Sequence, residues 1–199
     1  LKTPYILRLD GIYHDIKNTV GNTEELNRVI KESYDNAAGV IFQSKFDKWL
    51  VESIFGEHSA KNTVINNGNF IKPKSHYNDT NNYIACAAKW RRHKRLKETI
   101  ESFLESNISG YKLIIIGEPD NGSYNNYSRY NSILWKHDVP NGEVEQIVSN
   151  AKLFMDLSFC SHNNNTVVEA LSHHVPVICS NVGGNSELIE MTNLGTICE

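Results

Sequence analysis

Residues 112–117 carry the sequence Lys-Leu-Ile-Ile-Ile-Gly, in which four consecutive large apolar side chains precede a glycine. A strand with one face in water alternates apolar and polar residues, whereas a parallel strand covered by helices on both faces is apolar throughout. The stretch therefore predicts a buried strand of a parallel sheet, with helices packed against both faces of that sheet.

Strand and helix patterns alternate on both sides of this stretch, which predicts a Rossmann-like, doubly wound parallel α/β sheet over residues 83–199. Polar residues 119–130 are expected to form a surface loop. The remaining strands are expected at residues 83–88, 133–136, 153–158, 176–180 and 195–198, and the helices at 94–106, 142–150, 166–173 and 185–191.

Residues 1–66 show the same alternation and predict part of a second Rossmann-like domain. Strands are expected at 4–10, 39–43 and 63–66, and helices at 24–37 and 45–55. Asn22 and Glu25 have the spacing of a capping box, and Ser44 and Gly56 are placed to begin and end the second helix. Residues 67–82 are rich in Asn, Lys, Pro and Ser, lack periodicity and are predicted to be a linker.

Composition limits the classes of function that this chain can have. Its 199 residues have a net charge of −3, which gives no electrostatic reason to expect nucleic acid or an anionic membrane as partner. No segment approaches the ~20 apolar residues of a membrane span. The first residues do not form a signal peptide, and we expect a chain truncated at its N-terminus. The four cysteines form no C-x-x-C pair and are expected to be free thiols in the cytoplasm.

Five cations occupy the seven positions from Lys89 to Arg95, directly after the strand expected at 83–88. The carboxyl ends of parallel strands are where such sheets bind ligands, and a cationic loop that leads into a helix suits a diphosphate. The alternatives are a solvated basic loop, or a nucleic-acid patch that uses Trp90.

Two further polar loops follow strands in the same way. In residues 158–171, Glu169 is expected in the first turn of a helix, where the helix dipole keeps a carboxylate ionised and able to accept hydrogen bonds from both hydroxyls of a ribose. The alternative is an acidic residue that only stabilises the helix N-terminus. In residues 181–189, Gly183 and Gly184 allow the backbone to approach a phosphate closely; the alternative is a tight turn.

Several nucleotide and metal signatures are absent from the sequence. It contains neither G-x-G-x-x-G nor G-x-x-x-x-G-K-S/T, which argues against dinucleotide and P-loop sites. No His, Cys, Asp and Glu residues have zinc spacing, and His173 and His174 are adjacent, so they cannot share one helix face. No metal and no cofactor are expected.

The three loops together resemble glycosyltransferase family 4, also called glycosyltransferase group 1, whose members have the GT-B fold of two facing Rossmann-like domains. The resemblance is densest from Tyr83 onward. Lys89 stands where the family has an Arg, Lys94 matches its Lys, and Ile100-Glu101-Ser102-Phe103 matches its helix. The resemblance implies that Lys89 and Lys94 bind the diphosphate of the donor and, with Glu169, form the catalytic set.

The E-x7-E motif of the family ends here in Glu169-Ala170, whereas its first Glu falls on Ser161, a departure from the pattern. Pro176-Val177-Ile178 and Val182-Gly183-Gly184 match the next landmark, which ends in Glu187. The resemblance implies donor binding by a set of six residues: Ser161, Asn165, Thr166, Gly183, Gly184 and Glu187.

The N-terminal residues resemble the acceptor-side domain of the same family. The matching stretches are Arg8-Leu9-Asp10-Gly11, Val40-Ile41-Phe42-Gln43-Ser44 and, at the domain junction, Ile65-Asn66-Asn67-Gly68. On this resemblance, Arg8 and Asp10 are expected to contact the acceptor.

The function implied is hexosyl transfer from a nucleoside diphosphate sugar, with UDP or GDP as the nucleotide. The acceptor would be a hydroxyl of a glycan, lipid or protein, and the reaction would retain the anomeric configuration and need no metal. Two alternatives remain: a non-catalytic or partner-dependent module that binds nucleotide sugars, and a nucleic-acid-binding α/β domain. An apolar face left exposed by a partial domain would favour self-association.

Overall fold

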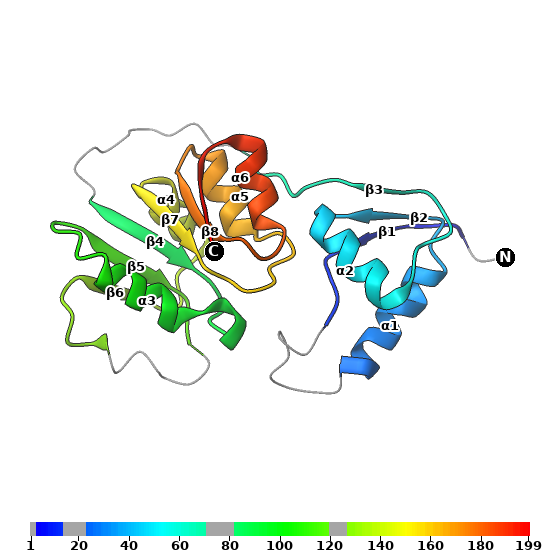
Figure 1. Cartoon of the computed structure of the whole chain (residues 1–199), viewed down its shortest axis with the longest axis horizontal. Helices are drawn as coiled ribbons and strands as arrows, with labels where there is room; N and C mark the ends of the chain where they lie inside the picture. Colours follow the sequence, from blue (N-terminus) through cyan, green and yellow to red (C-terminus); the bar gives the residue numbers. More distant parts are fainter. Residues whose placement is uncertain (1–2, 14–22, 71–81, 120–126) are drawn as a thin grey trace.

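The larger of two sheets is built around the apolar stretch at 112–117. A computed structural model describes residues 3–13, 23–70, 82–119 and 127–199 (Figure 1). Leu113 and Ile115 are fully buried in a six-stranded sheet of order β6-β5-β4-β7-β8-β9, in which each strand pairs with its neighbours in parallel. The strands are β4 (Tyr83–Ala87), β5 (Lys112–Ile116), β6 (Ile133–Lys136), β7 (Leu153–Asp156), β8 (Val177–Ser180) and β9 (Gly195–Cys198).

Helices cover both faces of this sheet, so the predicted doubly wound α/β fold is confirmed. On one face α3 (Leu96–Glu105) buries Ile100 and Phe103 against β4 and β5. On the other face, one core cluster contains residues of α4 (Asn141–Ser149), α5 (Asn165–Ser172) and α6 (Asn185–Thr192). The strand order reverses between β4 and β7, which makes the carboxyl ends of these two strands the topological switch point.

The helix expected at 94–106 begins later than the sequence pattern predicted. Residues Arg92–Lys94 form a short 3₁₀ helix, η1, and Arg95 then adopts a left-handed conformation with φ of 53°. Because a left-handed residue cannot continue a right-handed helix, α3 starts at Leu96. Lys94 therefore belongs to the loop that follows β4 and not to α3.

The N-terminal residues form a separate parallel sheet of order β1-β2-β3. Its elements are β1 (Ile6–Leu9), α1 (Thr23–Asp35), β2 (Gly39–Phe42), α2 (Lys45–Phe55) and β3 (Asn62–Val64). Ser44 is the N-cap of α2, because its Oγ accepts a hydrogen bond from the Asp47 amide at 2.9 Å, as expected. Asn22 of the predicted capping box, residues 71–81 of the predicted linker and residues 120–126 of the predicted loop lie outside the described residues.

Candidate functional site

Four loops meet at the carboxyl edge of the larger sheet. The loop after β4 pairs with the loop after β5 through a bridge between Trp90 and Pro119. It also contacts the loop after β7, whose Phe159 amide donates to the His93 carbonyl at 2.7 Å. The loop after β7 in turn pairs with the loop after β8 through a bridge between Ser161 and Gly183. The three segments singled out in the sequence therefore form one continuous surface across the switch point.

The two predicted phosphate-binding lysines both lie on the loop after β4. Lys89 is exposed and lines a pocket of about 500 Å³ together with Gly117 and Glu118, whereas Lys94 is half-buried at the end of η1. Gly117 has a φ of 101°, and a Cβ there would come within 2.1 Å of the Ala88 carbonyl oxygen. A glycine is thus needed to bring the loops after β4 and β5 together.

Trp90, between the two lysines, is a core residue. Its side chain is 5% exposed, and its Nε1 donates to the Ile116 carbonyl at 2.9 Å. A base cannot stack on this indole, so the proposed nucleic-acid patch using Trp90 is wrong in its aromatic component.

Asp156, at the end of β7, organises the loop that follows and was not identified from the sequence. Its buried carboxylate accepts hydrogen bonds from the Ser158 amide and from the side chains of Asn164 and Asn185. Asn164 is in turn the N-cap of α5 and accepts from the Thr166 amide and hydroxyl. The sequence signal that could have identified it is the acidic residue that directly follows the apolar residues 153–155 of a predicted strand.

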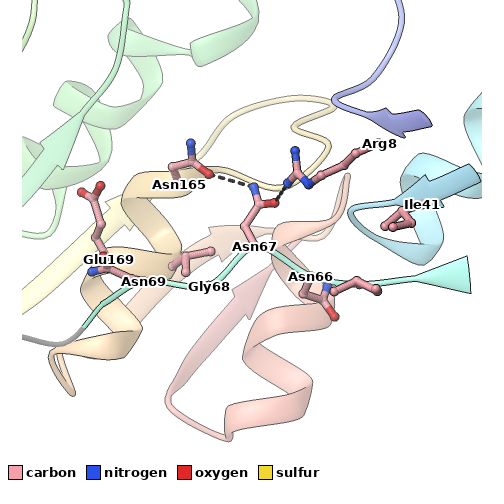
Figure 2. A pocket seen from close by; sticks show the side chains of 10 residues that line it. Arg8, Ile41, Asn66, Asn67, Gly68, Asn69, Asn165 and Glu169 are labelled. Carbon is pink, nitrogen blue, oxygen red and sulfur yellow. Dashed lines mark hydrogen bonds between the residues drawn. The ribbon is translucent and has the colours of Figure 1, made fainter. Parts of the chain in front are cut away.

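Glu169 is half-buried on α5 and lies beyond the first turn of the helix, in which the sequence had placed it. Burial raises the pKa of its carboxyl above the ordinary value, and the negative charge of Glu145 on α4 raises it further. Glu169 lines a pocket of about 420 Å³ together with Arg8, Asn67 and Asn165 (Figure 2).

Arg8 and Asn67 contribute to this pocket from the part of the chain that precedes the larger sheet, residues 3–70, which is called the N-terminal half below. The guanidinium of Arg8 donates to Asp10 Oδ1. It also donates to Asn67 Oδ1, and Asn67 Nδ2 donates to Asn165 Oδ1 at 2.7 Å (Figure 2). Arg8, predicted for the acceptor side, and Asn165, predicted for the donor side, thus line one pocket; Asp10 is exposed beside Arg8.

The predicted glycine turn lies against the loop that carries Ser161. Gly183 has a φ of 114°, and the Gly184 amide donates to the Ser161 carbonyl at 2.7 Å. A Cβ on Gly183 would come within 2.3 Å of the same carbonyl oxygen. Ser161 is itself buried, with 6% of its surface exposed.

Glu187 is placed differently from the other predicted donor residues. Its two carboxylate oxygens accept hydrogen bonds from the backbone amides of Lys45 at 2.9 Å and Phe46 at 2.7 Å, the first two residues of α2. The structure therefore joins Glu187 to the N-terminal half of the chain.

The described residues were expected to hold no metal ion and to contain no membrane span. In that part of the chain, no three His, Cys, Asp or Glu side chains are grouped so that they could hold a metal ion. None of its helices is long and apolar enough to cross a membrane.

The family model described as "Glycosyl transferases group 1" matches residues 68–199. No curated protein shows a significant sequence match. Among solved structures, HepE from Anabaena in complex with UDP and glucose is similar, with a TM-score of 0.76 and 18% identity over 98% of this chain and 57% of HepE.

Two other solved structures show the same likeness. Sucrose-phosphate synthase from Thermosynechococcus elongatus matches with a TM-score of 0.79 and 15% identity, over 99% of this chain and 55% of the synthase. WaaG, a glycosyltransferase involved in lipopolysaccharide biosynthesis, matches with a TM-score of 0.73 and 12% identity, over 96% of this chain and 60% of WaaG. The chain thus spans little more than half the length of these structures.

Proposed function

Since the chain belongs to the group 1 family of glycosyl transferases, we propose that it binds a nucleoside diphosphate sugar and transfers the sugar to an acceptor hydroxyl. The observation that carries the proposal is the continuous surface formed by the loops after β4, β7 and β8. This surface places two lysines, a half-buried carboxylate and a glycine turn at the edge where doubly wound sheets bind ligands.

In the proposed reaction, Lys89 and Lys94 stabilise the negative charge that develops on the departing diphosphate. Positioned cations at a developing charge are a major source of rate enhancement, and here they take the place of a metal ion. The Glu169 carboxylate accepts hydrogen bonds from the ribose hydroxyls. The loops that carry Ser161, Asn165, Thr166, Gly183 and Gly184 hold the phosphates and the sugar, and the anomeric configuration is retained.

For the donor we propose a hexose linked to UDP, with GDP as the alternative. UDP is named in the HepE complex, which supports this choice. The pocket shared by Arg8, Asn165 and Glu169 connects the donor side to the N-terminal half, where the acceptor would enter. The free cysteines, of which Cys86 and Cys179 are buried, support a cytoplasmic location.

A module that binds the nucleotide sugar without catalysing transfer is the second candidate. Ser161 favours it, because this residue stands where the family pattern has an acid and supplies no carboxylate to the site. Turnover of the donor separates the two candidates.

Titration calorimetry with UDP, GDP and UDP-glucose measures donor binding directly. The melting temperature gives a second measure, because a ligand that binds only the folded state raises it. Lys94→Ala is expected to weaken UDP binding by about tenfold or more, since charge-assisted hydrogen bonds to phosphate are among the strongest contacts available. Lys97→Ala is the matched control, because Lys97 lies on α3 beyond the loop and is exposed.

Each outcome of this experiment has a definite meaning. Binding of UDP by the wild type and by Lys97→Ala, with loss in Lys94→Ala, supports the donor site. Equal UDP affinity in the wild type and in a folded Lys94→Ala variant overturns it. Hydrolysis of UDP-glucose, or transfer from it to added acceptors, then favours the transferase over the binding module.

A further inference from the structure

The N-terminus of α2 is held by a side chain of α6, a helix that packs against the larger sheet. The first amides of a helix have no partner within the helix, and its N-terminus carries a partial positive charge. Glu187 of α6 supplies an acceptor for two of these amides, because its two carboxylate oxygens accept hydrogen bonds from the Lys45 and Phe46 amides. These residues lie 142 and 141 positions away in sequence. A carboxylate that accepts two amides at a helix N-terminus makes a strong, oriented contact.

A second contact runs in the opposite direction, from α2 to the loop after β7. Asp47, which is completely buried, lies with its Oδ1 2.7 Å from Nδ1 of His162. Ser44 Oγ, besides capping α2, donates to the His162 carbonyl at 2.7 Å. His162 is 4% exposed, so this contact is shielded from solvent.

Two glycines allow these groups to approach. A Cβ on Gly184 would come within 1.8 Å of the His162 carbonyl oxygen and 2.5 Å of Ser44 Oγ. A Cβ on Gly11, in the loop after β1, would come within 2.6 Å of the His162 ring. The contact is therefore closely packed from both halves of the chain.

The residues of this contact are chain neighbours of proposed donor residues. His162 directly follows Ser161, and Glu187 lies three residues after Gly184. We propose that Ser44, Asp47, His162 and Glu187 form a clasp in which Asp47 and Glu187 are positioning residues. They hold the loops after β7 and β8 in the arrangement that binds the donor, by fixing both loops to the N-terminus of α2.

This inference rests on the proposed function only for the identity of the ligand; the clasp itself is defined without one. It gives Glu187 a role in the contact between α6 and α2 and not in direct binding of the donor. It also implies that the loops after β7 and β8 depend on the N-terminal half of the chain, since two of the four clasp residues belong to that half.

Hydrogen exchange and UDP binding together test the proposal in the full chain. The variants are Glu187→Gln and Asp47→Asn, which keep the size of each side chain, and the control is Glu190→Gln, an exposed residue on the same helix as Glu187. In both clasp variants we expect faster amide exchange at 44–47, 158–164 and 181–184, with unchanged exchange in β5. UDP affinity is expected to fall roughly 5- to 10-fold, a common size for coupling between sites.

The two measurements keep failure of the clasp apart from failure of the proposed function. If the loops of the clasp variants exchange faster but the wild type binds neither UDP nor GDP, the clasp is supported and the proposed donor-binding function is overturned. Unchanged loop exchange in both clasp variants overturns the clasp, whatever the UDP result. Faster exchange with UDP affinity equal to that of Glu190→Gln also overturns it, because the loops would then not depend on the clasp for binding.

Discussion

At the scale of one residue, Glu169 is expected to make binding of the proposed donor depend on pH. Burial, and after it the charge of Glu145, raises the pKa of the Glu169 carboxyl above the ordinary value of 4.5. A protonated carboxyl loses part of its capacity to accept hydrogen bonds from ribose hydroxyls. UDP affinity is therefore expected to fall as the pH is lowered through this raised pKa, at a higher pH than for an ordinary glutamate.

The Glu145→Gln variant tests the smaller of the two causes of this shift. Gln keeps an oxygen near His173 Nε2, which lies 3.4 Å from Glu145 in the wild type, but removes the negative charge. The loss of UDP affinity should then move to lower pH, as measured by calorimetry between pH 4.5 and 7.5. An identical pH profile in wild type and variant would contradict the contribution of Glu145 to the shift.

The same raised pKa has a consequence for stability. A carboxyl whose folded-state pKa lies above its unfolded value binds more protons when folded, so the free energy of unfolding falls as the pH rises through that window. Glu169→Gln is expected to remove this decrease and leave a flatter profile above pH 4.5 in urea unfolding. A variant profile with the same slope as the wild type would show that Glu169 does not titrate in this range.

Gly184 tests close packing at a single position. Its φ of −77° suits any residue, so Gly184→Ala is opposed by packing alone, because a Cβ there would come within 1.8 Å of the His162 carbonyl oxygen and 2.5 Å of Ser44 Oγ. Overpacking of this kind costs about 1–3 kcal/mol in the free energy of unfolding. Gly142→Ala is the matched control, because a Cβ there meets nothing within 4 Å, and alanine stabilises a helix by up to ~1 kcal/mol. Equal urea midpoints for the two variants would contradict the packing argument.

At the scale of elements, α5 depends on its N-cap for the position of Glu169. Asn164 Oδ1 accepts from the Thr166 amide at 3.3 Å, while its Nδ2 donates to the buried Asp156. Asn164→Ala removes these bonds together with the one from the Thr166 hydroxyl, and is expected to cost about 1–3 kcal/mol of stability. Asn164→Ser keeps a capping oxygen and should cost less. Equal losses in urea unfolding would assign the whole effect to Asp156 and none to the cap.

The elements were predictable from the sequence to the extent that their causes are local. The apolar run of β5, the cap at Ser44 and the glycine turn at 183–184 each have a short-range signature, and all three appear in the structure. The left-handed Arg95, which delays α3, has no such signature, since arginine is not a residue that favours positive φ.

The joints between elements were not predictable, because their partners are far apart in the chain. Asp47 and His162 are separated by 115 residues, and each considered alone is only an acidic residue in the first turn of a helix or a polar loop residue. Glu187 matched a family motif and was assigned to the donor on that ground. Only the folded arrangement shows that its carboxylate meets two amides of α2.

At the scale of the whole molecule, the clasp determines whether the two sheets unfold together. Among the described residues of the N-terminal half, the core cluster has seven buried members, too few to make a strongly stable unit by themselves. The larger sheet has two extensive clusters, one on each face. The N-terminal half therefore depends for its stability on contacts with the larger sheet, and the clasp supplies buried hydrogen bonds between them.

Calorimetric unfolding of Asp47→Asn tests this dependence. The wild type is expected to unfold in one transition, whereas the variant should show an earlier transition confined to the N-terminal half. A buried hydrogen bond contributes about 1 kcal/mol, and 1 kcal/mol shifts the melting temperature of a small domain by roughly 4–8 °C, so the two transitions should separate by at least that amount. Exchange of the β2 amides before those of β5 on heating would assign the first transition. A single transition in which β2 and β5 amides exchange together, in the variant as in the wild type, would mean that other contacts couple the sheets.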